Sequence, residues 1–372
     1  MPRRSRSRVI LGPKKAKKTR GGDPEAPTEE EWRTMTEFGS FIVRDEDGDE
    51  HTFKKGDTAT VLPHKAQVGS GLELHQYWVV KIRDIRVRGE ADVWARVQWY
   101  WSGSEVQGVI KSLATASDGH ACGQYERIFS DHFDYVSSSA FDAVLPVKKF
   151  NENDLEQPHI DHGTFFTRYT FEYRARVIQP KPGEGTCTCG QPYSPDDSKT
   201  LMHFCPRPSC RRAYHDRCLT KAKSKDTDSP TTRALRLLST SPDSEEPLDL
   251  AELVPSEPPK KKRRGRPSKA AQEKGKAKHL HTVEELLEAL PRDLVRVAEQ
   301  PIVRGAAFVK GGVTGNVRAV VRARRMVYEA LAGRGEVPEE WEDEVDVERA
   351  IVVLPGKKML SALVCPECKS AI

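Results

Sequence analysis

Closely spaced cysteines constrain this chain more than any other feature. Seven of its eight cysteines, with one histidine, follow the order C-x-C, C-x4-C, H-x2-C and C-x2-C. Such pairs let a tight turn present two ligands to one tetrahedral zinc ion, and eight ligands fill two sites with no position open for a catalytic water. The pattern predicts two structural zinc ions. The predicted ligands are Cys187, Cys189, Cys205, Cys210, His215, Cys218, Cys365 and Cys368.

A disulfide framework and ordinary buried thiols are the alternatives for these cysteines. Disulfides need an oxidising compartment. The chain begins with the basic run MPRRSRSRVILGPKKAKKTR, which has no apolar stretch and no small-residue cleavage site of a secretory signal. We therefore expect a reducing compartment, where this spacing favours zinc. Cys122, the eighth cysteine, lies outside the pattern and is predicted to be an ordinary thiol.

The ligand order of four Cys, one His and three Cys resembles the plant homeodomain (PHD) finger, with Leu201-Met202 before the second pair and Tyr214 before the histidine. CTCGQPYSPDDSKTLMHFCPRPSCRRAYHDRCL resembles its first three-quarters and LVCPECKSAI its end. Ligands interleave in that family. The resemblance therefore implies one zinc ion on Cys187, Cys189, His215 and Cys218, and the other on Cys205, Cys210, Cys365 and Cys368.

A long insertion, Leu219 to Val364, interrupts this finger. Loop-closure entropy grows only with the logarithm of loop length, and metal binding can offset it. The last ligand pair can therefore still close the finger. The alternative is that Cys365 and Cys368 bind nothing or form a dimer contact.

Many PHD fingers read the histone H3 tail through an aromatic cage, and the matching positions here are incomplete. Tyr193 and Met202 fall where cage walls occur, but Ala213 stands where methyl-lysine readers that resemble this finger carry tryptophan. Phe204 and Pro206 replace the acidic residues that often flank the third ligand. The resemblance implies a structural role for the finger, or binding of an unmethylated tail.

Residues 38–178 form a second region, rich in alternating β-branched and aromatic residues. YWVVKIRDIRV and VWARVQWYW predict strands of a half-buried sheet, in a small barrel or sandwich. The region resembles the bromo-adjacent homology (BAH) domain through KKGDTATVLP, QYWVVKIRDI, ARVQWYW, IFSDHFDYVSSSAF and VLPVKKFNE.

Side chains alternate across a strand, so Trp99 and Trp101 project from one face. In BAH domains that bind methyl-lysine, the matching positions make the aromatic cage, which implies a cage of Trp78, Trp99 and Trp101. Aromatic faces bind a methylated ammonium group with about 2 kcal/mol per desolvated contact. Tyr77 replaces Trp78 if the register slips by one residue. The alternative is that these indoles are core residues.

The segment SDHFDYVS is predicted to be a loop beside this cage. The resemblance implies that its Asp131, His132 and Asp134 contact the histone tail. The alternative is that they are turn-forming or solvated residues.

The remaining sequence is polar: 31% of the residues are charged, 37% are hydrophobic, and the mean hydropathy is −0.63. Met1 to Pro27 and Lys221 to Lys278 are predicted to be disordered. The second stretch contains the basic run Lys260 to Arg264, which favours nuclear import or nucleic-acid binding. Its RGRP tetrapeptide resembles the AT-hook core, in which arginines enter the minor groove of A·T-rich DNA. The tetrapeptide is Arg264, Gly265, Arg266 and Pro267.

Helix signals return after this linker. Thr282 to Glu285 has capping-box spacing, and Asn316 to Ala332 keeps its apolar residues near one face before Gly333. We expect these helices to pack on the finger or on the β-region. No segment is long and apolar enough to span a membrane.

The sequence therefore predicts a multidomain chain with a mainly-β, BAH-like barrel and a two-zinc PHD-type finger, which is interrupted by a long insertion with disordered and helical parts. The predicted parts are a disordered basic N-terminus (1–37), the BAH domain (38–178), the first part of the finger (186–219), a disordered basic linker (220–280), a helical insertion (281–354) and the last ligand pair (355–372).

The predicted function is that of a nuclear chromatin reader, without enzymatic activity, similar to fungal BAH–PHD proteins. The resemblance implies a methylated histone tail as partner, with trimethylated lysine 27 of histone H3 as the best guess, and a role in transcriptional repression. A·T-rich DNA and corepressor proteins are further expected partners. The alternatives are an architectural or corepressor scaffold that does not read methyl-lysine, and a RING-like ubiquitin ligase.

Overall fold

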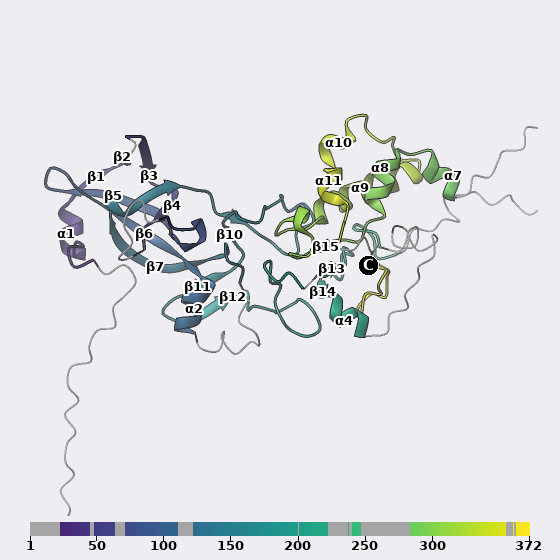
Figure 1. Ribbon diagram of the computed structural model, residues 1–372, viewed down its shortest axis with the longest axis horizontal. Coiled ribbons are helices and arrows are strands. Elements are labelled where there is room, and N and C mark those ends of the chain that lie inside the picture. The colour runs from purple at the N-terminus through teal and green to yellow at the C-terminus, as the bar shows by residue number, and fades with distance from the viewer. Residues whose placement is uncertain are drawn as a thin grey trace, which may run out of the picture. The chain divides into compact units, whose positions relative to one another are not determined.

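The computed structural model describes residues 23–44, 48–63, 71–110, 122–199, 201–221, 237, 240–246, 283–354, 360 and 362–372 (Figure 1). It divides into two compact units. The first comprises residues 1–100 and 130–146, and the second comprises 101–129 and 147–372. The division falls inside the region 38–178 that the sequence analysis treats as one domain.

The first unit is built from β-strands, as predicted. Its main sheet has the strand order β7-β6-β5-β4-β8, β1 also pairs with β5, and β2 and β3 form a separate hairpin. The strands are β1 (Thr36–Phe38), β2 (Ser40–Arg44), β3 (Glu50–Lys54), β4 (Thr58–Val61), β5 (Trp78–Arg88), β6 (Asp92–Ser102), β7 (Arg127–Ser137) and β8 (Phe141–Val144). Short 3₁₀ turns, η1 (Leu74–Gln76) and η2 (Ser138–Ala140), precede β5 and β8.

Strands β5 and β6 match the two predicted strand segments. They pair antiparallel with Val80 opposite Trp99. The expected alternation of buried and exposed residues is absent from the end of β6. Every residue from Val97 to Trp101 is buried, so both faces of the strand are covered there. Packed aromatic rings of Phe41, Phe53 and Phe141, with centroids 5.1 to 5.4 Å apart, also stabilise this unit.

The end of the predicted disordered N-terminus is ordered. Helix α1 (Glu29–Thr34) begins at a capping box in which Thr28 and Glu31 bond to each other's backbone N–H groups. Trp32 is buried in a cluster with Trp94, and its ring centroid is 4.6 Å from that of Tyr135. The buried Trp32 and the capped helix therefore fix the conformation of residues 29–34, which composition alone predicts to be part of a disordered tail.

The second unit contains short strands and most of the helices. Its elements are α2 (Gly103–Val109), β9 (Lys148–Lys149), β10 (Phe166–Thr167), β11 (Thr170–Glu172), β12 (Val177–Gln179), β13 (Met202–Phe204), β14 (Ala213–His215), α4 (Asp216–Lys221), α7 (Val283–Glu288), α8 (Arg292–Ala298), β15 (Val303–Arg304), η3 (Val309–Gly311), α9 (Val317–Leu331), α10 (Trp341–Glu344) and α11 (Val347–Ala350).

Helix α9 confirms the predicted amphipathic helix. Val317, Val320, Val327 and Leu331 are buried on its inner face, and Gly333 follows with a φ of +65°, in the left-handed conformation expected beyond a helix end. These side chains belong to one hydrophobic core with Met202, Phe204, Tyr214 and several of the cysteines. The helical insertion and the segments that carry the predicted zinc ligands are therefore one folded body. Thr282 lies outside the described residues.

Part of the predicted disordered linker also packs in this core. Leu237 is fully buried and its carbonyl accepts a hydrogen bond from the Tyr328 hydroxyl. The carboxylate of Asp243 accepts from the guanidinium of Arg325 at 2.9 Å. These contacts with α9 hold a polar segment in place, although the composition of the segment alone predicts disorder.

Candidate metal centres and tryptophan pair

The first group of candidate metal ligands contains Cys187, Cys189, His215 and Cys218. Their ligand atoms all lie within 4.8 Å of one another, and Cys189 Sγ is 3.4 Å from His215 Nδ1. A turn in which the Gly190 N–H donates to the Cys187 carbonyl brings the first two ligands together. His215 ends β14 and Cys218 lies on α4, so the other two ligands come from adjacent elements.

The second group contains Cys205, Cys210, Cys365 and Cys368, whose sulfur atoms also lie within 4.8 Å of one another. Cys205 Sγ is 3.4 Å from Cys368 Sγ, and Cys210 Sγ is 3.6 Å from Cys365 Sγ. Sulfur ligands of a tetrahedral zinc ion lie roughly 3.8 Å apart, whereas disulfide sulfurs are about 2.05 Å apart. The separations fit metal ligands and not disulfides.

The two groups are the interleaved sets that the resemblance implies. The Leu363 and Ile372 backbones exchange hydrogen bonds of 2.9 and 2.7 Å, and a turn in which the Cys365 N–H donates to the Ser370 carbonyl presents the last ligand pair. This hairpin carries Cys365 and Cys368 back to the finger across the long insertion. Both sets are thiolate-rich and closed, which is the donor chemistry of a structural zinc site.

Neighbouring groups stabilise the thiolates. The Tyr214 hydroxyl, fully buried, lies 3.3 Å from Cys210 Sγ, and the Ser370 hydroxyl lies 2.8 Å from Cys368 Sγ. Burial raises the pKa of Cys187, but hydrogen bonds from the His215 side chain and from backbone N–H groups lower it to about 5. Such partners favour the ionised thiol that binds a metal. Ser370 has no signal in the sequence, because its role depends on the turn that follows Cys368.

The insertion also adds a strand to the small sheet that lies between the ligand groups in the sequence. Strand β15 pairs antiparallel with β13, giving the order β14-β13-β15, with Met202 opposite Arg304. Met202 and Tyr193, the two predicted cage positions of the finger, are fully buried, and the Tyr193 hydroxyl donates to the Val313 carbonyl. An added peptide strand needs an exposed sheet edge, and β15 already occupies this edge of β13.

In the first unit, two of the three predicted cage residues lie against each other. The ring centroids of Trp78 and Trp99 are 5.6 Å apart and their planes are nearly perpendicular, at 88°. Trp78 is partly exposed, whereas Trp99 has no exposed surface. A ligand can therefore reach the Trp99 ring only after a neighbouring side chain moves. The Trp78 ring contacts the Trp99 ring directly, so Trp78 is the side chain whose movement would expose it.

Trp101, the third predicted cage residue, lies near the end of β6, where the segment 101–129 of the second unit begins. Its ring stacks on Tyr173 with centroids 5.5 Å apart and meets Phe171 edge-on at 5.7 Å. It is 6% exposed. These contacts resemble core packing, which the sequence analysis gave as the alternative for the tryptophans.

The segment predicted to be a loop beside the cage is part of strand β7, so the predicted loop conformation is wrong, whereas contact with a histone tail stays a prediction. The apolar residues of β7 do not alternate with polar ones, so pairing in the sheet and not a local pattern makes this segment a strand. Asp131 is exposed, whereas His132 and Asp134 are partly buried. The extended backbone therefore puts Asp131 on one face of β7, and His132 and Asp134 on the other.

Burial raises the pKa of Asp134 to about 6, although the Tyr135 N–H and the Trp99 indole lower it. The Tyr135 N–H donates to Asp134 Oδ1 at 2.9 Å. Tyr77 is partly buried, and its pKa is raised by burial and by Asp142. The AT-hook-like residues 264–267 lie outside the described residues.

Known proteins resemble this chain only in the fold of one part. No family model and no curated protein matches the sequence. Among solved structures with a similar part is the crystal structure of the yeast Rsc2 BAH domain, with 9% identity and a TM-score of 0.26, over 42% of this chain and 57% of that chain. The match thus spans little more than half of that chain, and it assigns neither a family nor an activity. Among the described residues, no helix has the length and apolar character to cross a membrane.

Proposed function

We propose that this chain is a nuclear chromatin protein that acts by binding and not by catalysis. In this proposal the first unit captures a methylated histone lysine, and two zinc ions hold the second unit in its folded form. The best guess for the mark is trimethylated lysine 27 of histone H3, with an outcome of transcriptional repression, as the BAH and PHD resemblances imply.

One observation carries the reader proposal: two indole rings meet at 88° with centroids 5.6 Å apart. Perpendicular aromatic faces are the walls that solvate a methylated ammonium group, which water solvates poorly. Trp78 is the wall that solvent reaches. Binding in this proposal displaces Trp78 from Trp99 and inserts the methylammonium group between the two rings.

The test is titration of the full, zinc-loaded chain with histone tail peptides that differ only in lysine methylation, at physiological salt. We expect methylated peptides to bind at least about tenfold more tightly than the unmodified peptide, a difference of roughly 1.4 kcal/mol. Tryptophan fluorescence should change as Trp78 moves. Trp78→Ala should remove the methyl dependence.

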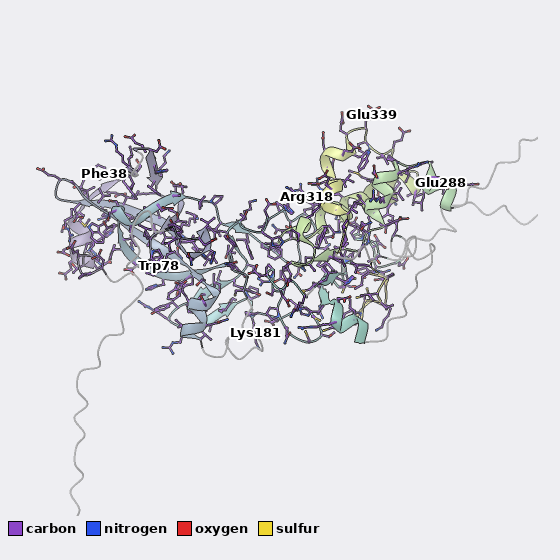
Figure 2. All side chains as sticks on the ribbon, in the orientation of Figure 1. Phe38, Trp78, Lys181, Glu288, Arg318 and Glu339 are labelled. Carbon is purple, nitrogen blue, oxygen red and sulfur yellow. The ribbon has the colours of Figure 1, made fainter. Side chains whose placement is uncertain are left out.

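Phe38→Ala is the matched control, because Phe38 is an exposed aromatic residue of the same unit on another strand, with 47% of its surface accessible (Figure 2). It should leave peptide binding unchanged. Equal affinity for methylated and unmodified peptides in the unmutated chain would refute the reader proposal.

Full burial of Trp99 favours a second candidate, an architectural or corepressor scaffold. In that case the indoles are core, and affinity for chromatin comes from phosphate contacts of the basic segments, including Arg264 and Arg266. Such binding falls steeply with salt and is indifferent to methylation. A salt titration on A·T-rich DNA and on methylated peptides separates the two candidates.

For the finger, the geometry supports a structural role. The edge of β13 is paired with β15, and the positions of its expected cage are buried in the core. Two zinc ions per chain, measured by elemental analysis of the purified protein, is the expected result. A ubiquitin-discharge assay tests the RING-like alternative, for which we expect no activity.

A further inference from the structure

Strand β15 joins the edge of β13 in the way that a bound peptide strand does. It has two residues and pairs antiparallel with β13, with Arg304 opposite Met202 (Figure 1). In the same pairing the Phe204 N–H donates to the Ile302 carbonyl at 2.8 Å. An added strand is recognised by backbone hydrogen bonds, which give affinity, and by pockets for alternate side chains, which give specificity. The backbone part of such recognition is therefore present between two segments of one chain.

The side chain of Arg304 fills a pocket of aromatic rings. Its guanidinium carbon lies 5.2 Å from the ring centroid of Tyr193, 5.4 Å from that of Phe204 and 5.8 Å from that of Phe150. Its Nη1 is 4.0 Å from Glu152 Oε2, and its Nη2 donates to the Glu152 carbonyl at 3.2 Å. Three rings and one carboxylate therefore enclose a buried cation, which is the composition of a cation–π site.

The rings contribute more than ion pairing to this pocket. A separation of 4.0 Å is at the limit of a salt bridge. The Nε atom of Arg304 is buried, and no acceptor of the described residues reaches it in hydrogen-bond geometry. A guanidinium group is planar, stacks on aromatic faces and is more weakly hydrated than an ammonium group. The pocket is therefore selective for a guanidinium group over a primary ammonium group.

A second buried arginine of the same unit is held differently. Arg324, on α9, is as buried as Arg304. Its three nitrogens donate at 2.9 to 3.2 Å to the backbone carbonyls of Ala298, Thr240 and Gln300. Directed hydrogen bonds to carbonyls thus hold Arg324, whereas aromatic faces surround Arg304.

We propose that the edge of β13 and this pocket form a binding site for an extended peptide with an arginine side chain, and that β15 is its internal ligand. The site is closed to a second peptide as long as β15 occupies it. The buried Asn316 keeps β15 in place, because its Oδ1 accepts from the Val303 N–H at 2.8 Å and its Nδ2 donates to the Pro301 carbonyl at 3.0 Å. The helical insertion thus supplies both the ligand and the residue that retains it. This inference is independent of methyl-lysine binding by the first unit.

The first experiment empties the pocket of the full, zinc-loaded chain with Arg304→Ala and refills it with a small cation. Ethylguanidinium is the part of the side chain that this substitution removes, and propylammonium is the corresponding part of a lysine. The variant should melt roughly 10 °C below the unmutated chain. Ethylguanidinium at about 10 mM should raise the melting temperature of the variant by about 3 °C. Propylammonium at the same concentration should have no effect.

Arg324→Ala is the matched control, because it empties an equally buried site that is lined by carbonyls. Carbonyls accept from both ions, so this variant should show no preference between them. Equal effects of the two ions on Arg304→Ala, or no effect of either, would overturn the inference. If Arg304→Ala does not fold alone, refolding with ethylguanidinium, and not with propylammonium, should restore its zinc content. Failure of both ions to do so would again overturn it.

A second experiment tests the peptide site itself. A peptide with the sequence of residues 300–306, QPIVRGA, should bind Arg304→Ala at least about tenfold more tightly than the unmutated chain, whose site is filled. The same peptide with alanine in place of its arginine should lose this binding. Equal affinity for the two proteins, or binding that does not depend on the arginine, contradicts the proposed site.

Hydrogen exchange of the unmutated chain needs no variant. The Phe204 N–H, which donates to the Ile302 carbonyl, should exchange as slowly as the buried N–H groups of α9, because β15 stays on the edge. Exchange at the rate of an exposed N–H group would show that the edge is open, and β15 would then not be an internal ligand.

Discussion

Buried charge is handled differently in the two units. In the second unit Arg168, almost wholly buried, donates to Glu126 at 2.7 Å and to Glu152 at 2.6 Å, and hydroxyl groups lie against the cysteine sulfurs. In the first unit Asp84 is paired with two cations, but Asp134 has none among the described residues. Paired charges of this kind maintain a fold, whereas an acid held at a cost to stability indicates a ligand site. In the first unit, the acid without a cation lies on β7.

The largest expected effect is loss of the folded second unit when a zinc ligand is removed. Cys210→Ser removes one ligand of the all-cysteine site, and the core contains cysteines together with the α9 side chains. Structural zinc contributes about 10–16 kcal/mol of apparent binding energy in small fingers. We expect bound zinc to fall from two ions to one or none, with loss of cooperative unfolding of the second unit.

Elemental analysis and near-ultraviolet circular dichroism measure both effects. Cys122→Ser is the control and should keep both ions, because Cys122 belongs to neither group of ligands. Two zinc ions in Cys210→Ser would show that the four cysteines do not form a metal site.

The next largest effect tests whether Trp99 is a wall of a site or a core residue. Removing a fully buried indole costs about 3–5 kcal/mol, so Trp99→Ala should strongly destabilise the first unit. Trp78→Ala should cost clearly less, because part of that ring is exposed. Urea unfolding curves measure both. Equal losses for the two variants would contradict the difference in burial and make Trp78 as much a core residue as Trp99.

A smaller effect is the dependence of stability on pH. The folded-state pKa of Asp134 is about 6, above the unfolded value of 3.8, so the folded chain binds more protons between these values. The contribution of Asp134 to stability therefore falls as the pH rises from about 4 to 6. Asp134→Asn should remove this fall and stabilise the protein at pH 7 by about 1–2 kcal/mol, allowing for partial solvation. Thermal unfolding of both proteins at several pH values provides the measurement. A less stable variant at pH 7 would mean that the carboxylate has an unrecognised structural partner.

The smallest effect concerns the thiolates. Tyr214→Phe removes the hydroxyl 3.3 Å from Cys210 Sγ, for a loss of about 1 kcal/mol. Zinc transfer to a chelator should become faster. Tyr193→Phe is a matched control, because it also removes a buried hydroxyl, one that donates to the Val313 carbonyl. If both variants release zinc at the same rate, the Tyr214 hydroxyl has no special effect on the metal site.

The parts of the fold that depend on local pattern could be predicted from the sequence. Strands β5 and β6 have a dense run of β-branched and aromatic residues, and α9 has an apolar stripe at helical spacing. The resemblance to an interleaved finger also gave the correct grouping of the ligands into two sets. Each of these signals lies in a few neighbouring residues or in a fixed order of ligands.

Other parts depend on contacts between distant residues and could not be predicted. Residues 131–134 contain polar residues typical of a loop, yet pairing in the sheet keeps them extended in β7. Strand β15 is only two residues long, and these residues form a strand because they pair with β13. Leu237 and Asp243 are ordered by α9, about 80 to 90 residues further along the chain.

The sequence alone determined the ligand chemistry, the two central strands and the main helix, because spacing and periodicity act over a few residues. Only the tertiary structure decided which charges find partners. Asp84 on β5 and Asp134 on β7 belong to one sheet, yet only Asp84 meets two cations. The reason is that desolvation and pairing depend on what surrounds a carboxylate in space, and residues distant in sequence supply those surroundings.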